Sequence, residues 1–277
     1  MFLVVKVKLL TRVLNMKNNI EEYVKNLYLT DEYIIKNPSL HEEDSPWKVG
    51  KIIPLVDRLI CHINKDEINL LDVGGGAGLI LNAVSNYIEK SYGIKVHKFA
   101  LDLSPGMLEI QKKRNPDLKK ALNEDIHKTS LGNKEIDLTL MIDLLEHVPN
   151  PTGALEEVKR ISNFVILKVP LEDNLRFRQG NFRRGGKPRQ LAIETIGHIN
   201  IYNFSKLKYQ IEKHAGRVLE FYFTNVFDYF LNSKHYKSKM PAQEKLINLI
   251  AAYTFRLSPQ LCSRIFNDFV MILAKCY

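Results

Sequence analysis

The sequence predicts an α/β fold, a doubly wound and mostly parallel sheet of seven strands with helices between them. Three observations lead to this prediction. Short apolar runs alternate with amphipathic segments along most of the chain, which is the pattern of repeated β–α units. The first apolar run is nearly continuous and ends in glycines, as expected of a strand buried on both faces of a parallel sheet. Hydrophobic residues make up 45% and charged residues 26% of the 277, which excludes a disordered or fibrous chain.

A helical cover is expected ahead of the sheet, in residues 1–63. Apolar side chains within residues 20–29 recur at the spacing of one buried helix face. A second helix is expected over residues 49–63, with Pro54 near its first turn. Residues 64–277 are assigned to the α/β domain.

The N-terminal stretch and the cysteines indicate a cytoplasmic protein. The first fifteen residues mix apolar side chains with Lys and Arg and have no small-residue cleavage site, so no signal peptide is expected. Because this composition is awkward for a folded segment, Met16 is an alternative start to Met1. The apolar stretches are shorter than the roughly 18 to 20 residues that cross a bilayer. Cys61, Cys262 and Cys276 are far apart and odd in number, so reduced thiols are expected.

Five strands and three helices are expected in the first part of the α/β domain. The strands are predicted at residues 68–74, 95–104, 118–126, 135–148 and 163–172. The helices are predicted at residues 78–93, 104–114 and 151–162. Ser104 can cap the second of these helices, and Pro105 fits its first turn.

The C-terminal part adds a basic loop and a sheet edge. The loop, residues 176–189, holds six Lys and Arg residues and no acidic residue. A helix over residues 205–216 is expected to end with Gly216 as its C′ residue. The remaining elements are a strand at 217–227, a helical insertion at 229–265 and a last strand at 267–277. Two strands joined by a helical insertion predict a hairpin-like edge of the sheet.

The segment LLDVGGGAG, residues 70–78, carries the chemistry. Ligands of open α/β sheets bind beyond the carboxyl ends of the strands, where the strand order reverses. Gly74, Gly76 and Gly78 allow the backbone to turn sharply and to approach a ligand without interference from a Cβ. A nicotinamide dinucleotide is disfavoured, because Leu79 stands where its fingerprint has a third glycine. A Walker phosphate loop is absent, since no Gly-Lys-Ser/Thr follows the glycines.

Residues 66–215 resemble the class I methyltransferases that use S-adenosyl-L-methionine, and they look closest to the small-molecule, ubiquinone-biosynthesis-like group. LLDVGGGAG resembles the first motif of that family. The resemblance implies S-adenosyl-L-methionine as the cofactor, with Asp72 helping to hold the amino group of its methionine part. It also implies methyl transfer to an acceptor that is small or lipid-like.

Two further segments resemble the family motifs that surround the nucleoside. ALDLSPGML, residues 100–108, contains a strand-end carboxylate, Asp102, for which the resemblance implies hydrogen bonds to both ribose hydroxyls. The resemblance places Leu103 and Met107 near the adenine. In NEDI, residues 123–126, it implies that Asp125 faces the adenine amino group, with Ile126 beside it.

DLLEHVP, residues 143–149, resembles the family's fourth strand end and the turn after it. The resemblance places Asp143 at the methionine end of the cofactor and makes this turn the entrance for the acceptor. A general base is needed only where the accepting group has a high pKa. His147 is the preferred candidate, with Glu146 as the second, whereas a capping or packing role is the alternative for His147. His198, in a GHINIY segment that resembles a family pattern, is a candidate for acceptor binding or for a hydrogen bond that holds its loop.

The basic loop is compatible with more than one kind of acceptor. Arg183 and Arg184 are candidates for binding an anionic acceptor or a lipid headgroup, because guanidinium groups bind phosphate and carboxylate bidentately. The alternatives are a solvated insertion and a nucleic-acid contact. The tetrapeptide of amino-directed DNA methylases is absent after the fourth strand, where the chain has DLLE. RNA methylation and a non-catalytic binding protein therefore remain as alternative functions.

Partners and metals are predicted from the same patterns. The apolar face of the helical insertion at 229–265 is expected to pack over the sheet edge or to cap the acceptor pocket. Peripheral contact with a membrane and a homodimer surface are the alternatives. The chain is expected to be a monomer or a homodimer. No metal is expected, because no cluster of His, Cys and carboxylate residues has ligand spacing in the sequence.

Overall fold

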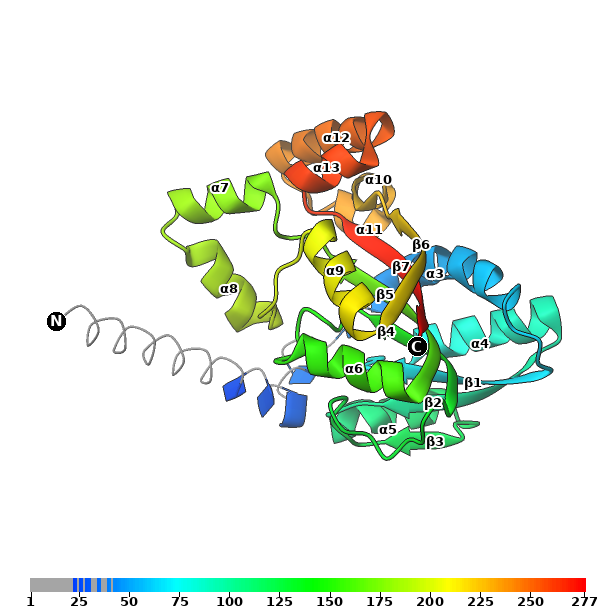
Figure 1. Ribbon diagram of the computed structural model, residues 1–277. Helices are drawn as coiled ribbons and strands as arrows, with labels where there is room; N and C mark the ends of the chain where they lie inside the picture. Colours follow the sequence, from blue (N-terminus) through cyan, green and yellow to red (C-terminus); the bar gives the residue numbers. More distant parts are fainter. Residues whose placement is uncertain (1–21, 24, 27, 31–33, 36–38, 41) are drawn as a thin grey trace.

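The computed structural model describes residues 22, 23, 25, 26, 28–30, 34, 35, 39, 40 and 42–277. Its core is a seven-stranded sheet in the order β3-β2-β1-β4-β5-β7-β6, in which β7 runs antiparallel to both of its neighbours (Figure 1). The strands are β1 Glu67–Val73, β2 Lys95–Leu101, β3 Lys120–Leu122, β4 Ile136–Ile142, β5 Ser162–Pro170, β6 Gly216–Phe223 and β7 Phe269–Cys276. The predicted fold class is confirmed, with the antiparallel pair at one edge.

Helices cover both faces of the sheet (Figure 1). After the 3-10 turn η1 Glu42–Asp44, the helices along the chain are α3 Ser45–Ile60, α4 Leu79–Tyr92, α5 Pro105–Arg114, α6 Pro151–Ile161, α7 Leu175–Arg183, α8 Lys187–Ile196, α9 Phe204–His214, α10 Val226–Asn232, α11 Lys234–Lys237, α12 Ala242–Leu257 and α13 Pro259–Ile265. One apolar core joins α3, α4 and α5 to the sheet, and a second joins α6 and α9 to its other face.

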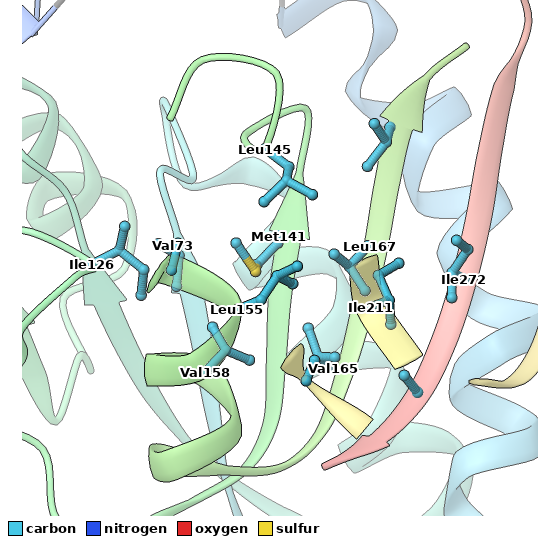
Figure 2. Close-up of a cluster of buried hydrophobic side chains, with 14 of the residues drawn as sticks. Val73, Ile126, Met141, Leu145, Leu155, Val158, Val165, Leu167, Ile211 and Ile272 are labelled. Atoms are coloured by element: carbon cyan, nitrogen blue, oxygen red, sulfur yellow. The ribbon is translucent and has the colours of Figure 1, made fainter. Parts of the chain in front are cut away.

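Figure 2 shows why these sequences form layers. Leu155 and Val158 of α6 and Ile211 of α9 point towards alternate side chains of the neighbouring strands, among them Met141 and Leu167 (Figure 2). Every residue of β4 is buried, because a central parallel strand packs against helices on both sides. The antiparallel register pairs Leu167 with Ile272 and extends this core to the sheet edge.

The strand order determines where a ligand can bind. The chain moves from β1 to β2 and β3 in one direction, and then returns to β4 on the other side of β1. The connections after β1 and β4 therefore separate at the carboxyl edge of the sheet and leave a crevice between them. The glycine segment follows β1 and the DLLEHVP segment follows β4, so the two motifs meet at this crevice.

Two predicted local features differ in the structure. Pro54 lies in the interior of α3, because the helix begins earlier, at Ser45, and Pro46 occupies its first turn. Gly216 follows the C-cap residue Ala215 of α9 and so occupies the predicted C′ position, but it is the first residue of β6 and does not adopt the left-handed conformation of a helix cap. At Gly216 φ is +153°, and a Cβ would lie 2.0 Å from the carbonyl oxygen of Lys275, so the close approach of β7 requires glycine there.

The predicted basic loop at 176–189 is a pair of helices, α7 and α8. Asn174 caps α7 by accepting a hydrogen bond from the backbone N–H of Phe177 at 3.0 Å. The turn between the helices uses Gly185 and Gly186, both with positive φ. The insertion at 229–265 consists of several short helices around the longer α12. The alternative starts Met1 and Met16 lie outside the described residues.

Candidate functional site

A cavity of about 820 Å³ lies at the carboxyl ends of the parallel strands. Its wall contains the turns after β1, β2 and β4, together with side chains from α3, β5, α10 and β7. Glu22, Lys25 and Tyr28 from the start of the described chain also line it. The cavity is large enough for a nucleoside-sized ligand and a second small molecule.

The glycine turn after β1 forms one side of the cavity. The backbone N–H of Gly74 donates to the carbonyl of Leu101 at 2.8 Å, which ties the turn to the end of β2. Gly74 and Gly76 have φ of +64° and +53°, values that a side chain would strain. At Gly75 a Cβ would lie 2.2 Å from Oδ2 of Asp72. Gly78 does not line the cavity; it begins α4 and packs against Asn115.

Asp72 is buried at the base of this turn, with 1% of its surface exposed. Its Oδ2 has no hydrogen-bond partner among the described residues. Burial, helped by the nearby carboxylate of Asp102, raises the pKa of Asp72 to about 7. A buried carboxyl oxygen without a donor, at the edge of a cavity, is suited to a cationic or hydrogen-bond-donating group of a ligand.

Asp102 stands one strand over, directly after β2. It accepts a hydrogen bond from the backbone N–H of Ser104 at 2.9 Å, which fixes its carboxylate at the start of α5. Leu103, Met107 and Ile126 line the cavity beside it and form an apolar slot. The arrangement can hold a flat ring next to a polyhydroxyl group.

Asp125 lines the same region but already has partners. His127 contacts it through Nδ1 at 2.5 Å and through its backbone N–H at 3.1 Å. Lys25 forms an ion pair with its second oxygen at 3.2 Å. Although burial opposes it, these contacts lower the pKa of Asp125. The carboxylate is therefore held in place on the cavity wall by the chain itself.

A buried charge cluster that the sequence analysis missed lies on the opposite wall. Asp143 forms ion pairs with Lys168 of β5 and with Lys48 of α3, the latter at 3.0 Å. Although burial opposes it, the two ammonium groups lower the pKa of Asp143 below its usual range. Asp143 also has φ of +53°, which is uncommon for a residue with a side chain and is found at ligand sites. Lys168 interrupts the apolar strand NFVILKVP, and this was the available signal.

Glu146, His147 and His198 come together next to this cluster. Their ligand atoms all lie within 4.8 Å of one another, a set that could hold a metal ion and that sequence spacing did not predict. Burial raises the pKa of Glu146 to about 8, and its Oε2 has no partner among the described residues. His147 Nδ1 lies 3.2 Å from the hydroxyl of Tyr28.

His198 is held by a second carboxylate. Its Nδ1 lies 2.9 Å from Oε1 of Glu172. Although burial opposes it, Glu172 and then Glu146 raise the pKa of His198. The imidazole rings of His147 and His198 meet edge to face with centroids 4.8 Å apart. The three side chains can therefore receive, hold or pass a proton at the cavity wall.

Aromatic side chains form the remaining wall. Trp47 of α3 stacks on Tyr229 of α10 with ring centroids 4.8 Å apart. The ring centroid of Phe269 of β7 lies 3.4 Å from Nζ of Lys168. Phe230 and Tyr236 extend the wall towards the surface. These residues come from segments that are far apart in the sequence, so local patterns could not group them. Such a wall suits an apolar or aromatic group of a ligand.

Most of the predicted site residues meet in one cavity. Asp72, Gly74, Gly76, Asp102, Leu103, Met107, Asp125, Ile126, Asp143, Glu146, His147 and His198 all line it. Gly78 lies outside it. Arg183 and Arg184 line a second, open groove of about 760 Å³ between α7 and α12. Phe230 and Tyr236 line both, so the groove adjoins the aromatic wall.

The sequence was compared with models of known protein families. Residues 71–163 match the family model described as a methyltransferase domain. None of the curated proteins matches the sequence significantly.

The fold is similar to that of solved structures at low sequence identity. The complex of the Haloferax volcanii Trm112 methyltransferase activator with a methyltransferase has a chain that is 12% identical, with a TM-score of 0.54 over 87% of this chain and 97% of that one. Geranyl diphosphate C-methyltransferase from Streptomyces coelicolor, solved with S-adenosyl-L-homocysteine, is 12% identical, with a TM-score of 0.54 over 81% and 76%. The SpnF cyclase is 11% identical, with a TM-score of 0.51 over 80% of both chains.

Proposed function

We propose that this chain, in which residues 71–163 match the methyltransferase domain model, transfers a methyl group from S-adenosyl-L-methionine to a small or lipid-like, anionic acceptor. One observation carries the proposal. A glycine turn, an unpartnered buried carboxylate at the end of β1 and a second carboxylate at the end of β2 line one cavity beside an apolar slot. The subgroup within the family stays a prediction.

The residues at the β1 and β2 ends fit the cofactor. Asp72 would receive the amino group of its methionine part, because its Oδ2 is buried and has no donor among the described residues. Asp102 would accept the ribose hydroxyls, and Leu103, Met107 and Ile126 would contact the adenine. The bound cofactor supplies an activated methyl group on a sulfonium. The protein then has to orient the acceptor and exclude water.

The opposite wall supports an acceptor with an apolar part. Trp47, Tyr229 and Phe269 offer ring faces, and the ammonium groups of Lys48 and Lys168, which are paired with Asp143, lie beside them as polar contacts. Geranyl diphosphate, the substrate named for the Streptomyces enzyme of this fold, combines the same two properties. Residues 22–48 contribute Tyr28, Trp47 and Lys48 to the cavity, which supports the proposal that residues 1–63 act as a cover.

His147 is the proposed general base. It lies on the turn after β4 and lines the cavity, and Tyr28 contacts its Nδ1. His198, held by Glu172, and the buried Glu146 lie within reach to take up or return the proton. A base is required only where the accepting group is a phenol, an alcohol or a protonated amine.

The test combines calorimetry with a labelled-methyl screen. We expect S-adenosyl-L-homocysteine to bind the full chain, and labelled S-adenosyl-L-methionine to modify a lipid or small-molecule fraction of a cell extract. His147→Gln should lower transfer about 100-fold or more while leaving cofactor affinity unchanged; His62→Gln, exposed at the end of α3, is the matched control.

Two outcomes would redirect the proposal. Cofactor binding without transfer to any fraction would favour a non-catalytic protein or another reaction, since a cyclase shares the fold. Label in the RNA fraction alone would favour RNA methylation. Absence of cofactor binding would overturn the proposal.

A further inference from the structure

The positive charge of the chain is concentrated in one part of the molecule. We call residues 175–196 and 229–267, which contain α7, α8 and α11 to α13, the basic cap. The basic cap holds twelve Lys and Arg residues and two acidic residues, whereas the rest of the chain holds 28 and 29. The whole net charge of +9 therefore arises from the basic cap. In Figure 1, α12 and α13 lie at the top and α7 and α8 at the left, whereas α5 and β3 lie at the bottom.

Exposed apolar side chains gather on the same part. Ten of the sixteen large, exposed hydrophobic residues among those the structure describes belong to the basic cap. Phe182, at the end of α7, is 87% exposed and is the most exposed of all sixteen. Single exposed apolar residues are ordinary, whereas several that share one face of a helix mark an interaction surface.

Helix α12 carries the largest part of this surface. One face packs inward through Ala251 and Ala252, which are buried. The opposite face presents an apolar stripe at helical spacing: Leu246, Leu249, Ile250, Tyr253 and Leu257, each 50% to 70% exposed. Lys245 and Arg256 lie beside the stripe. An exposed apolar stripe flanked by basic residues is typical of a helix that lies in a membrane interface.

The cationic groups are available to a partner. Arg183, Arg184 and Lys245 are exposed, and no ion pair involving them is found within the described residues. Arg176, Arg183, Arg184 and Lys239 line the open groove between α7 and α12. The floor of that groove includes Phe230 and Tyr236, which also form the aromatic wall of the cavity.

We propose that the basic cap docks on the surface of an anionic lipid bilayer, with the α12 stripe and Phe182 among the lipid chains and the arginines at the headgroups. A nucleic acid would match the charge but not the apolar stripe. A second copy would match the stripe but would meet a like-charged surface. An anionic bilayer matches both. No helix in the described part of the chain is long and apolar enough to span a membrane.

Docking in this position would make the groove between α7 and α12 an entry route for the acceptor. A lipid-like acceptor that leaves the bilayer between α7 and α12 would pass the arginines and reach Phe230 and Tyr236 at the cavity wall. This route rests on the proposed function, whereas the docking surface does not.

The experiment is sedimentation of the full chain with vesicles. We expect binding to vesicles of phosphatidylcholine enriched in phosphatidylglycerol, weaker binding at high salt, and little binding to phosphatidylcholine alone. Leu249→Gln/Tyr253→Gln/Leu257→Gln should lower the partition coefficient about tenfold or more. Arg183→Gln/Arg184→Gln should lower it about tenfold.

Matched controls lie away from the basic cap. Tyr209→Gln changes a 62% exposed ring on α9, and Lys112→Gln/Lys113→Gln removes two exposed charges of α5; both should bind vesicles like the unaltered chain. Circular dichroism and binding of S-adenosyl-L-homocysteine establish that each variant is folded.

Three results would overturn docking. They are failure of the unaltered chain to bind anionic vesicles, equal loss of binding in the control variants, and light scattering that shows a dimer dispersed by the α12 substitutions. Tight binding to RNA that survives those substitutions would also count against it. Because vesicle binding and cofactor binding are measured separately, failure of docking leaves the proposed methyl transfer standing.

Discussion

The two ends of the cavity are built in different ways. At the β1 and β2 ends, the ligand-facing groups are a backbone turn and two carboxylates, Asp72 and Asp102, which lie in consecutive β–α units. At the other end the groups are aromatic and charged side chains from α3, β5, α10 and β7. The first end depends on chain geometry that a short motif encodes. The second depends on tertiary packing between distant segments.

The proposed cofactor end is built in a way that does not depend on the acceptor, whereas the other end is particular to this chain. We propose that the cradle of backbone and carboxylates binds the cofactor, whatever the acceptor is. The aromatic wall with its Asp143–Lys168–Lys48 cluster defines the shape and charge that the acceptor meets. Substitutions at one end should therefore leave the binding constant at the other end almost unchanged.

The largest expected effect is on stability, at the acceptor end. Lys168→Met removes one partner of a buried ion pair and leaves Asp143 with Lys48 alone, so we expect a loss of about 3 kcal/mol in the free energy of unfolding. Urea denaturation measures it. Lys168→Met/Asp143→Asn should regain part of the loss. A loss below about 1 kcal/mol would show that the cluster is effectively solvated.

The next effect is on the cofactor end. Asp102→Ala should weaken binding of S-adenosyl-L-homocysteine by about 1.5 to 3 kcal/mol, because charge-assisted hydrogen bonds to the ribose are lost. Calorimetry measures the change, with Asp66→Ala, an exposed carboxylate ahead of β1, as the control. Unchanged affinity would mean that the second motif does not contact the ribose.

A smaller effect is expected when the affinity for S-adenosyl-L-homocysteine is measured at different pH values. With a pKa of about 7, Asp72 is mainly protonated at pH 6 and ionised at pH 8, so affinity for S-adenosyl-L-homocysteine should rise about tenfold across this range. Asp72→Asn should bind weakly at both values and remove the dependence. A slope that persists in the variant would assign the titration to another group.

The same shift has an opposite consequence for the unliganded protein. The folded chain holds the Asp72 proton more tightly than the unfolded chain does, so its contribution to stability is complete below the ordinary pKa of 3.8 and is lost as pH rises through about 7. The unfolding free energy of the unaltered protein should therefore fall relative to Asp72→Asn over this interval, as denaturation at several pH values can measure.

The smallest expected effect is on the acceptor. Trp47→Leu removes a ring that stacks on Tyr229 and should raise the KM for the methylated fraction about two- to tenfold, while affinity for S-adenosyl-L-homocysteine stays the same. Steady-state transfer assays measure it, with Tyr209→Leu on the surface of α9 as the control. A change in cofactor affinity instead would mean that the two ends are coupled.

Sequence patterns predicted the sheet and one end of the cavity because both are local. Asp72 and its glycines are within a few residues of each other, and the strand order then brings Asp102 beside them. Lys168 was visible as a charge in an apolar strand, but its partners Asp143 and Lys48 depend on how β5 and α3 pack. His198 and Glu146 meet across about fifty residues, so ligand spacing along the chain could not reveal their proximity.

The helical state of α7 and α8 was missed for a related reason. Glycines and arginines in this segment suggested a loop, whereas the cap at Asn174 and the two glycines between the helices divide it into two short helices. Local propensity gave little information there, because neither helix buries a residue of its own and each is instead bounded by its caps.

The stacked pair of Trp47 and Tyr229 has a practical consequence. Trp47 is the single tryptophan of the chain, and its ring forms part of the wall away from the glycine turn. The tryptophan fluorescence of the protein, excited at wavelengths where tyrosine does not absorb, therefore originates from one indole in this cavity. Its emission reports the arrival of an unlabelled acceptor candidate directly, even when no turnover takes place.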